Sequence, residues 1–440
     1  MRLKGSVGLG VILAVALIVR VGVIVASPDF QPIFDAADFD RHADSIADGH
    51  WYPPPQLGVD GPTAFRPPLY PAALAVVQAV GGAWTAERLL SALLGVLTVL
   101  LVYLIARRLW GQRVATVAGA IAAVFPPLVM FSATILSEAL FLPLVLGAVL
   151  AVLYFRDTQR MRWVVAAGVL CGLAVLTRAN GLPLVLALAV GVWTSRPLLS
   201  RRALVAPAVV VLATALTIVP WVIRNAIEFD RYVGITTSGG FALAGTYNAE
   251  ARSEAEHPGQ PVSPNQLDTY QDELTRRDLD EDEMIGLLND QATDYIRDHP
   301  GYVAQTFLWN IPRLLDIERS DSFEKTFATS QLQAIGVEKI DSAVVFLGSL
   351  YVVLLTALAG AALQITGRGP RRAPLFVWLV PLSLVVLALA IYGLPRYRAP
   401  ADPFLILLAS VAVVWAFDSA RGQSGSSRER TVSNSSSAAS

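Results

Sequence analysis

The sequence predicts an all-α polytopic membrane protein, and three observations support that prediction. Hydrophobic residues make up 54% of the 440 residues and charged residues only 16%, well below the roughly 25% of an ordinary soluble domain. The mean hydropathy is +0.53. The apolar residues also cluster in long runs, which are typical of helices that cross a membrane. Together these observations exclude a soluble enzyme, a disordered chain and a DNA-binding domain.

Net charge and the cysteine and histidine content narrow the class further. The net charge is −1, so the chain as a whole has no field that would attract nucleic acid, and we expect no nucleic-acid partner. The chain has a single cysteine, Cys171, so an intrachain disulfide is excluded. Cys171 lies inside an apolar run. The four histidines have no paired spacing, which argues against a His-built metal site. We therefore expect no cofactor, with a divalent cation as the alternative.

Ten apolar segments are candidates for helices that cross roughly 30 Å of hydrocarbon with their backbone groups satisfied internally. The first of them also fits a secretory signal peptide, because a basic start and an apolar core precede Val25-Ala26-Ser27. The pair around 163–194 is separated only by a short polar turn, and its second member is short. The predicted spans are 7–26, 87–106, 114–132, 135–155, 163–178, 181–194, 203–223, 343–366, 373–392 and 399–417.

Arginines predict how these spans are oriented. The connections at 107–113, 156–162, 196–202 and 368–372 each carry three arginines, whereas the alternate short connections carry only isolated ones. Because positive charge is retained on the cytoplasmic side, this pattern places both termini in the cytoplasm. The protein is therefore expected to be a multi-pass protein of the plasma or inner membrane.

The same orientation divides the chain into four parts and places two large loops outside. Inside the second loop, 279–298 predicts a helix that stops before Pro300, and the amphipathic segment 301–316 suits the membrane interface. The Ser-rich tail is typical of disorder. The predicted parts are an N-terminal transmembrane module at 1–223 with a catalytic first outer loop at 27–86, an extracytoplasmic loop region at 224–342, C-terminal transmembrane helices at 343–418, and a disordered cytoplasmic tail at 419–440.

Charged side chains gather at the outer ends of the predicted spans, although they come from distant parts of the chain. Charges near span ends are costly unless they are paired, solvated or functional. Simpler explanations stay open: Glu138 can cap its helix, Arg224 can be an interfacial anchor, and Arg88 can pair locally with Glu87. Arg20, inside the first span, needs a partner or an outward snorkel. The outer set comprises Asp35, Asp38, Asp40, Arg66, Glu138, Arg178, Arg224 and Arg396.

This combination of side chains points to a particular chemistry. A carboxylate can act as general base toward a hydroxyl group, and guanidinium groups bind phosphate and stabilise charge on a departing phosphate. The chain has no GxxxxGK[ST] motif and no GxGxxG after a strand. The set therefore suggests a donor that is already activated and already in the membrane, such as a group linked to a lipid phosphate.

Six motifs resemble those of the GT-C superfamily of membrane glycosyltransferases, specifically the group related to dolichyl-phosphate-mannose protein mannosyltransferases and bacterial aminoarabinose transferase. In the first motif, Asp35 precedes the aromatic Phe39 by four residues. Family members often carry a second acid directly after the first, but this chain has Ala36, which leaves the parts of Asp38 and Asp40 open. The motifs are Asp35–Phe39, Thr63–Pro71, Leu136–Phe141, Leu176–Gly181, Trp221–Asn225 with Thr236–Gly240, and Pro395–Pro400.

The resemblance implies transfer of a sugar from a polyprenyl-phosphate donor, with inversion, at the outer membrane surface. Asp35 would take the proton of the acceptor hydroxyl, and Asp38 is the second catalytic candidate. The donor phosphate would be bound by Arg66, with Arg178 and Arg396 as further candidates. The acceptor is a glycan, a lipid or a protein. Further candidates for the substrate site are Glu138, Arg224, Asp40 and Tyr397.

Two other classes of function compete with this interpretation. One is a transporter or flippase for a lipid-linked or anionic substrate, although transporters usually place charges near the membrane midplane. The other is a non-catalytic scaffold of the same fold. Replacement of Asp35 separates the enzyme from the scaffold, because a scaffold would be indifferent to it.

Overall fold

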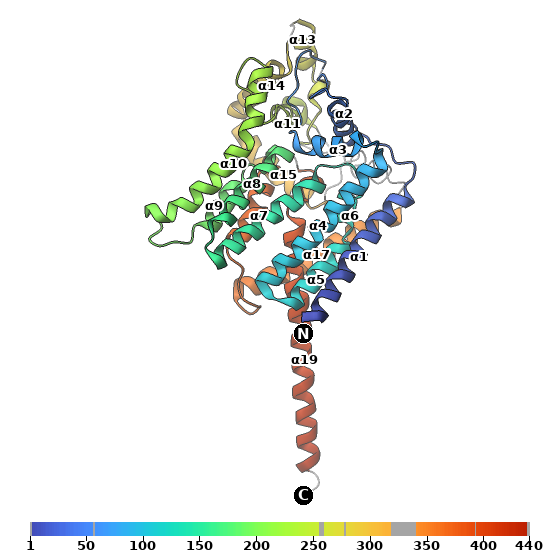
Figure 1. Cartoon of the computed structure of the whole chain (residues 1–440), viewed down its shortest axis with the longest axis vertical. Coiled ribbons are helices and arrows are strands. Elements are labelled where there is room, and N and C mark those ends of the chain that lie inside the picture. Colours follow the sequence, from blue (N-terminus) through green and yellow to red (C-terminus); the bar gives the residue numbers. More distant parts are fainter. Residues whose placement is uncertain are drawn as a thin grey trace.

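The computed structural model describes residues 2–55, 58–254, 259–276, 279–317, 340–391 and 393–437, and within these ranges the chain is helical (Figure 1). Its one pairing of extended backbone there is an isolated bridge between Asp60 and Asp280. The predicted all-α class is confirmed. The segment 318–339, which belongs to the predicted second loop, lies outside the described residues.

Six helices are long and apolar enough to cross a membrane, and the chain is an integral membrane protein. The other four predicted spans correspond to shorter apolar helices, so ten crossings remain a prediction. The six long helices are α1 (Arg2–Ala26), α4 (Trp84–Trp110), α7 (Glu138–Thr158), α10 (Arg201–Glu228), α17 (Ile340–Thr366) and α19 (Asp402–Ser437), and the shorter ones are α5 (Gln112–Val124), α8 (Met161–Thr177), α9 (Leu184–Val192) and α18 (Phe376–Ile391).

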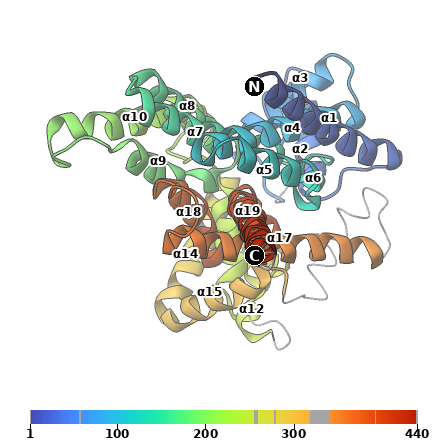
Figure 2. The ribbon, with the colours of Figure 1, turned by 90° about the horizontal axis from the view of Figure 1, so that it is seen from below.

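These helices pack with α7 in the interior and with α1, α10 and α17 toward the edges (Figure 2). In the most apolar stretch of α7, 78% of the residues are buried, against 22% in α17. Helix α8 packs closely on α10 because Gly168 and Gly172 present no side chain. A Cβ atom at Gly168 would lie 2.6 Å from that of Ala213. Small residues four positions apart are a common device for close helix packing in membranes.

The predicted span 114–132 is interrupted. Helix α5 ends at Val124 and the short helix α6 (Pro126–Phe131) begins immediately afterwards, because a proline has no N–H group to continue the helix. Arg20 forms hydrogen bonds on both sides of this break. Its Nη1 atom donates to the carbonyl oxygen of Ala123 at 3.0 Å, and its Nε atom donates to Ser132 Oγ at 2.7 Å. Arg20 is fully buried and thus has partners rather than snorkelling outward.

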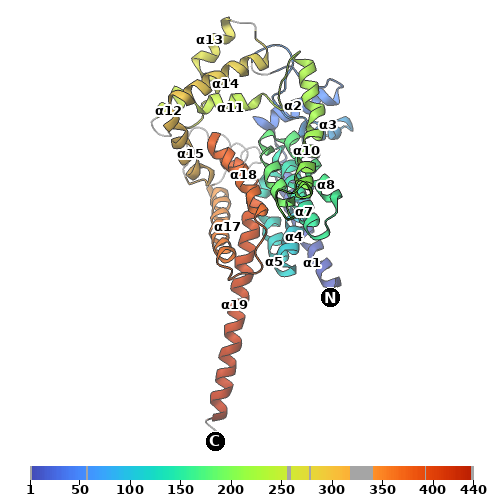
Figure 3. The same cartoon turned by 90° about the vertical axis from the view of Figure 1, so that its left-hand side faces the viewer.

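The two predicted outer loops form one polar layer over one end of the membrane helices (Figure 3). As predicted, they carry helices, and the helix expected at 279–298 is present as α14. The first loop contains α2 (Asp35–Ala47) and α3 (Leu69–Ala79). The second contains α11 (Ser238–Thr246), α12 (Ala249–Ser253), η2 (Pro264–Gln266), α13 (Asp268–Arg276), α14 (Glu281–Asp298) and α15 (Pro300–Leu314).

Both termini lie at the end of the molecule opposite to this polar layer (Figure 1). The sequence predicts disorder from 419 onward, whereas the structure continues α19 as helix to Ser437.

Candidate active site

Asp35 and Asp38 both lie on the first turn of α2. The spacing of three residues puts both carboxylates on one face of the helix, and acids are favoured near a helix N-terminus. Phe34 directly before them has φ 50° and ψ −121°, a left-handed backbone that is costly for a residue with a side chain. This turn brings the chain from α1 into α2 and sets the direction of Asp35.

Arg66 joins the two acids. Its Nη2 atom donates to Asp35 Oδ1 at 2.6 Å, and its Nε atom donates to Asp38 Oδ2 at 2.6 Å. The guanidinium group also lies over the ring of Phe39, with its carbon 4.9 Å from the ring centre. Arg66 precedes Pro67 and Pro68, whose rings restrict the backbone there. The sequence-predicted partners Asp35, Asp38 and Arg66 thus form one cluster.

Arg396, on the short helix η3 (Pro395–Arg398), connects this cluster to the start of α7. Its Nη1 atom donates to Asp35 Oδ2, its Nε atom donates to Glu138 Oε1, and its Nη2 atom donates to Glu138 Oε2 at 3.1 Å. Arg178, which follows α8, contacts the same Glu138 carboxylate at 2.8 Å and donates to Ser137 Oγ at 3.0 Å. The paired oxygens of Glu138 therefore bind two arginines.

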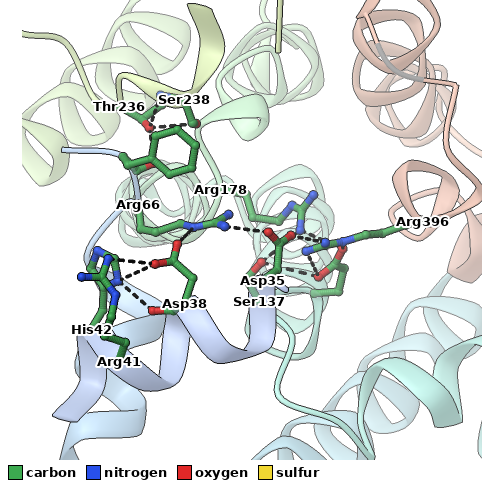
Figure 4. Close-up of polar contacts among 12 residues, drawn as sticks. Asp35, Asp38, Arg41, His42, Arg66, Ser137, Arg178, Thr236, Ser238 and Arg396 are labelled. Carbon is green, nitrogen blue, oxygen red and sulfur yellow. Dashed lines mark hydrogen bonds and ion pairs between the residues drawn. The ribbon is translucent and has the colours of Figure 1, made fainter. Parts of the chain in front are cut away.

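The result is an alternating row of charges across the end of the bundle (Figure 4). Three carboxylates and three guanidinium groups balance each other in formal charge. Exposure differs along the row, because the side chain of Asp35 is 29% exposed, that of Asp38 10%, and that of Glu138 1%. The row, which we call the charge network, runs Asp38, Arg66, Asp35, Arg396, Glu138 and Arg178.

Electrostatics keeps the acids of the outer loop ionised. Burial opposes the charge on Asp35, but Arg66 and Arg396 outweigh burial and hold the pKa of Asp35 well below its ordinary value. Burial likewise opposes the charge on Asp38, while hydrogen bonding from His42 and the charge of Arg66 hold its pKa low. The same pairing outweighs the cost of burying the cations and raises the pKa of Arg66 and of Arg396.

Two predicted substrate-site residues, Tyr397 and Asp40, have different surroundings. Tyr397 joins the site, because the Arg178 guanidinium lies 5.5 Å from the centre of its ring. Asp40 is directed away from the network: it accepts hydrogen bonds from Gln78 at 3.1 Å and from Trp84 at 2.9 Å. Burial raises the pKa of Asp40.

Arg224 lies behind Arg66 rather than in the network. Its Nη1 atom donates to the carbonyl oxygen of Thr63 at 2.9 Å, and its guanidinium group lies over the rings of Tyr52 and Trp221, at 5.3 Å and 5.0 Å. It therefore supports the segment that carries Arg66, and its contact with a substrate stays a prediction.

Sequence reasoning missed several neighbours of the network. Arg41 Nη2 donates to Asp38 Oδ1 at 3.1 Å, and His42 Nδ1 lies 3.3 Å from the same oxygen and 2.7 Å from the carbonyl oxygen of Asp38. Their spacing of three and four residues from Asp38 is a signal that could have revealed them. Glu281, a buried acid of α14 that contacts Thr63, gave no such signal, because it lies in an acid-rich stretch.

The acids of the network are paired with arginines, and no grouping of metal-ligand residues accompanies them in the part of the chain that the structure describes. Within the described part of the chain, no three His, Cys, Asp or Glu side chains are grouped so that they could bind a metal ion. Each carboxylate of the network accepts hydrogen bonds from arginine, and the expectation that the site needs no metal ion stays a prediction.

Fold and site together define a polytopic helical membrane protein whose buried ion-pair network lies where its polar layer meets the ends of its spans. Residues 65–222 match the family model described as dolichyl-phosphate-mannose-protein mannosyltransferase. No curated protein sequence gives a significant match.

Two solved structures of archaeal oligosaccharyltransferase share the fold, and a third structure gives a weaker alignment. The apo oligosaccharyltransferase of Archaeoglobus fulgidus aligns with a TM-score of 0.54 at 15% identity, over 94% of this chain and 51% of that one. The oligosaccharyltransferase AglB of the same archaeon, in complex with an inhibitory peptide and a dolichol-phosphate, aligns with a TM-score of 0.52 at 15% identity, over 93% of this chain and 50% of that one. ArnT from Cupriavidus metallidurans bound to undecaprenyl phosphate aligns with a TM-score of 0.41 at 16% identity, over 92% and 77%.

The chain spans about half the length of the archaeal oligosaccharyltransferases that it matches. The predicted resemblance is confirmed, and the chain has the GT-C fold.

Proposed function

We propose that the protein is an inverting glycosyltransferase that moves a sugar from a polyprenyl-phosphate donor to an acceptor at the outer face of the membrane. The observation that carries this proposal is that Arg66 and Arg396, from distant parts of the chain, donate to opposite oxygens of the single carboxylate of Asp35. Two cations directed at one acid are suited to binding a phosphate next to a general base.

The two arginines would stabilise the leaving group. As the bond between the anomeric carbon and the phosphate oxygen breaks, its electron pair leaves with the phosphate, and Arg66 and Arg396 offset the charge that develops there. Arg178 is bound to the same Glu138 as Arg396 and can contribute a further guanidinium. We propose that these arginines serve in place of a metal ion.

Asp35 would be the base. The acceptor oxygen forms a bond to the anomeric carbon opposite the departing phosphate, and the hydroxyl proton passes to Asp35. A single in-line displacement of this kind inverts the anomeric centre. Of the three carboxylates, Asp35 has the most exposed side chain, at 29%, so it is the one that an acceptor can approach. Phosphate oxygens would compete with Asp35 for the arginines and so free its oxygens for the proton.

The remaining acids would position these groups. Asp38 binds Arg66 together with Arg41 and His42, and only 10% of its side chain is exposed. Glu138 is 1% exposed and binds Arg178 and Arg396. Buried acids with all of these partners keep the guanidinium groups in place before the donor arrives, which is the preorganisation that electrostatic catalysis needs.

An apolar groove supports a lipid-linked donor. It lies between α9 and α18 and has a volume of about 470 Å³. Helix α18 packs against both η1 (Ala179–Gly181), which follows Arg178, and η3, which carries Arg396. A prenyl chain in the groove would therefore leave its phosphate near these arginines. Lining residues include Pro183, Leu186, Val190, Leu382, Val386 and Ala390.

We place the site outside the cytoplasm. Three arginines at each predicted inner connection favour cytoplasmic termini, and the site lies at the end of the bundle opposite to the termini. The acceptor would be a glycan, a lipid or a protein at the cell envelope.

The test is turnover of a panel of polyprenyl-phosphate sugars by membranes that contain wild-type protein, Asp35→Asn or Asp44→Asn. Asp44 is an exposed acid of the same helix and is the matched control. We expect wild type and Asp44→Asn to release polyprenyl phosphate from at least one donor, and Asp35→Asn to lose this activity. Equal turnover by all three would exclude Asp35 as the base. If folded wild-type protein used no donor, transport or scaffolding would replace the enzyme hypothesis.

A further inference from the structure

The backbone segment that presents Arg66 is bound by side chains at almost every peptide group. Four residues, 63–66, form this segment, which we call the Arg66 segment. The carbonyl oxygen of Phe65 accepts a hydrogen bond from Thr236 at 2.7 Å, and that of Arg66 accepts one from Tyr52 at 2.8 Å. These bonds fix the backbone from which the Arg66 side chain extends.

Glu281 provides the central contact. This acid is fully buried at the start of α14, in the second outer loop. Its Oε1 atom accepts from the backbone N–H of Ala64 at 2.9 Å and from Thr237 Oγ1 at 2.7 Å. Its Oε2 atom accepts from Thr63 Oγ1 at 2.5 Å. One carboxylate therefore joins three separate parts of the polar layer.

The position of Glu281 is itself well fixed. Asp280 caps α14 by accepting from the N–H of Glu283, whose side chain in turn accepts from the N–H of Asp280. This reciprocal cap satisfies two backbone groups at the helix start. Arg231 also binds Asp280 and Asp282 on either side of Glu281. The end of α14 is thus a rigid base for the buried carboxylate.

A purely structural anchor would need only packing, but this contact leads directly to the network. Ala64 is two residues before Arg66, and Arg66 binds both Asp35 and Asp38. Displacement of the segment by a fraction of an ångström would move the guanidinium relative to Asp35. Misplacement of about 1 Å can cost about 100-fold in rate.

We propose that Glu281 is a positioning residue for donor binding: it fixes the Arg66 segment so that the Arg66 guanidinium meets the donor phosphate. The second outer loop would thereby take part in the reaction without contacting the donor. The inference rests on the proposed function of Arg66.

The test compares Glu281→Ala with Glu281→Gln in the full-length protein, with undecaprenyl phosphate as the binding probe. A glutamine oxygen can still accept from Ala64 and Thr237, whereas alanine cannot. We expect Glu281→Ala to weaken binding by about 10- to 100-fold and Glu281→Gln to change it only a few-fold. Asp290→Ala, an exposed acid of the same helix, is the control and should bind as wild type does.

A double-mutant cycle with Arg66→Gln separates positioning from general stability. If Glu281 acts through Arg66, Glu281→Ala will weaken binding no further once Arg66 has been replaced, because residues that act through one another are not additive. Additive losses, or unchanged binding by Glu281→Ala, would overturn the proposal.

Hydrogen exchange of the Ala64 amide is a readout that does not depend on the donor. Glu281→Ala should speed this exchange while Asp290→Ala leaves it unchanged, and slow exchange in both would overturn the proposal. If Arg66→Gln bound the probe as wild type does, the proposed function of Arg66 would fail, and fast exchange in Glu281→Ala would still establish the contact.

Discussion

Arg396 and Asp35 are 361 positions apart in the sequence, yet the Nη1 atom of Arg396 donates directly to Oδ2 of Asp35. The contact brings the turn before the last membrane helix onto the first outer loop. The same guanidinium binds both oxygens of Glu138. Arg396 is therefore the residue that connects the two halves of the charge network.

Replacement of Arg396 should have a large effect. Loss of a single stabilising donor at a developing anion costs about 100- to 1000-fold in kcat, and we expect a loss of this size for Arg396→Gln. Arg396→Lys should restore little, because a single ammonium cannot reproduce the fork that reaches two carboxylates. Steady-state kinetics with an active donor measures both variants.

Arg396→Gln also leaves Glu138 with one partner fewer, so its effect on folding must be separated from its effect on the reaction. The double variant Arg396→Gln/Glu138→Gln removes one charge of each sign. It should unfold at a higher temperature than Arg396→Gln while staying inactive. Recovery of turnover in the double variant would contradict a role for Arg396 in the reaction.

The pH dependence follows from the lowered pKa of Asp35 and Asp38. Their ordinary value is about 3.9. An acid whose pKa is lowered on folding stabilises the folded protein above the unfolded-state pKa, and this stabilisation is lost only as the pH falls through the folded-state value.

Neither acid should therefore produce an acidic limb in the profile of kcat/KM, or a fall in melting temperature, between about pH 5 and pH 8. Rates and melting curves recorded across this interval check the prediction. An acidic limb centred near pH 6 that vanished in Asp35→Asn would show that Asp35 titrates in the free protein much higher than its arginine partners allow.

The groove between α9 and α18 can be tested by narrowing it. Leu186 lines the groove and is 67% exposed, so Leu186→Trp should obstruct a long prenyl chain. We expect KM to rise for a donor with a long prenyl chain and to stay nearly constant for a farnesyl-phosphate sugar. Leu212→Trp, at an exposed apolar position on α10, is the control. An equal change for both chain lengths would place the prenyl chain elsewhere.

Arg88 connects two segments that lead into the charge network, and its replacement tests whether that connection stabilises the fold. In the structure it does not pair with the adjacent Glu87: its Nη1 and Nη2 atoms donate to the carbonyl oxygen and the hydroxyl of Ser27, and its Nε atom donates to the carbonyl oxygen of Ala133. It thereby joins the chain entering the first outer loop to the chain leading to Glu138.

Arg88→Met would remove both bonds to Ser27 and would leave the carbonyl oxygen of Ala133 without this donor, and a buried polar group left unpaired costs about 1–3 kcal/mol. Thermal unfolding of the purified protein in detergent should show a clear fall in melting temperature. Arg113→Met removes an arginine whose side chain is 72% exposed and should change the melting temperature little. Equal melting of both variants would refute a structural role for Arg88.

The sequence predicted the helical class, the apolar segments and all six members of the charge network, because span length, arginine placement and local motifs are local properties. It did not predict the partners. Asp35 and Asp38 share a helix face, which spacing indicates, but the approach of Arg396 to Glu138 depends on how separate helices pack.

Glu281 was hidden for a different reason. It stands in sequence between Asp280 and the pair Asp282 and Glu283. A run of four acids is typical of a solvent-exposed surface. Only burial against Thr63 and Ala64 distinguishes it. Asp40 shows the reverse case, because its sequence position next to Phe39 resembles that of a site residue while its side chain binds Gln78 and Trp84 instead.

The equal numbers of acids and guanidinium groups in the charge network also limit how the site can evolve. Removal of one member leaves an uncompensated charge at a poorly hydrated position, and breaking a buried pair typically costs about 3–5 kcal/mol. A descendant sequence can lose Glu138 with little loss of folding stability only if it also loses a neighbouring cation such as Arg178. Drift at these positions should therefore proceed in pairs of opposite sign, and a lineage that abandons the chemistry should shed the whole row rather than single residues.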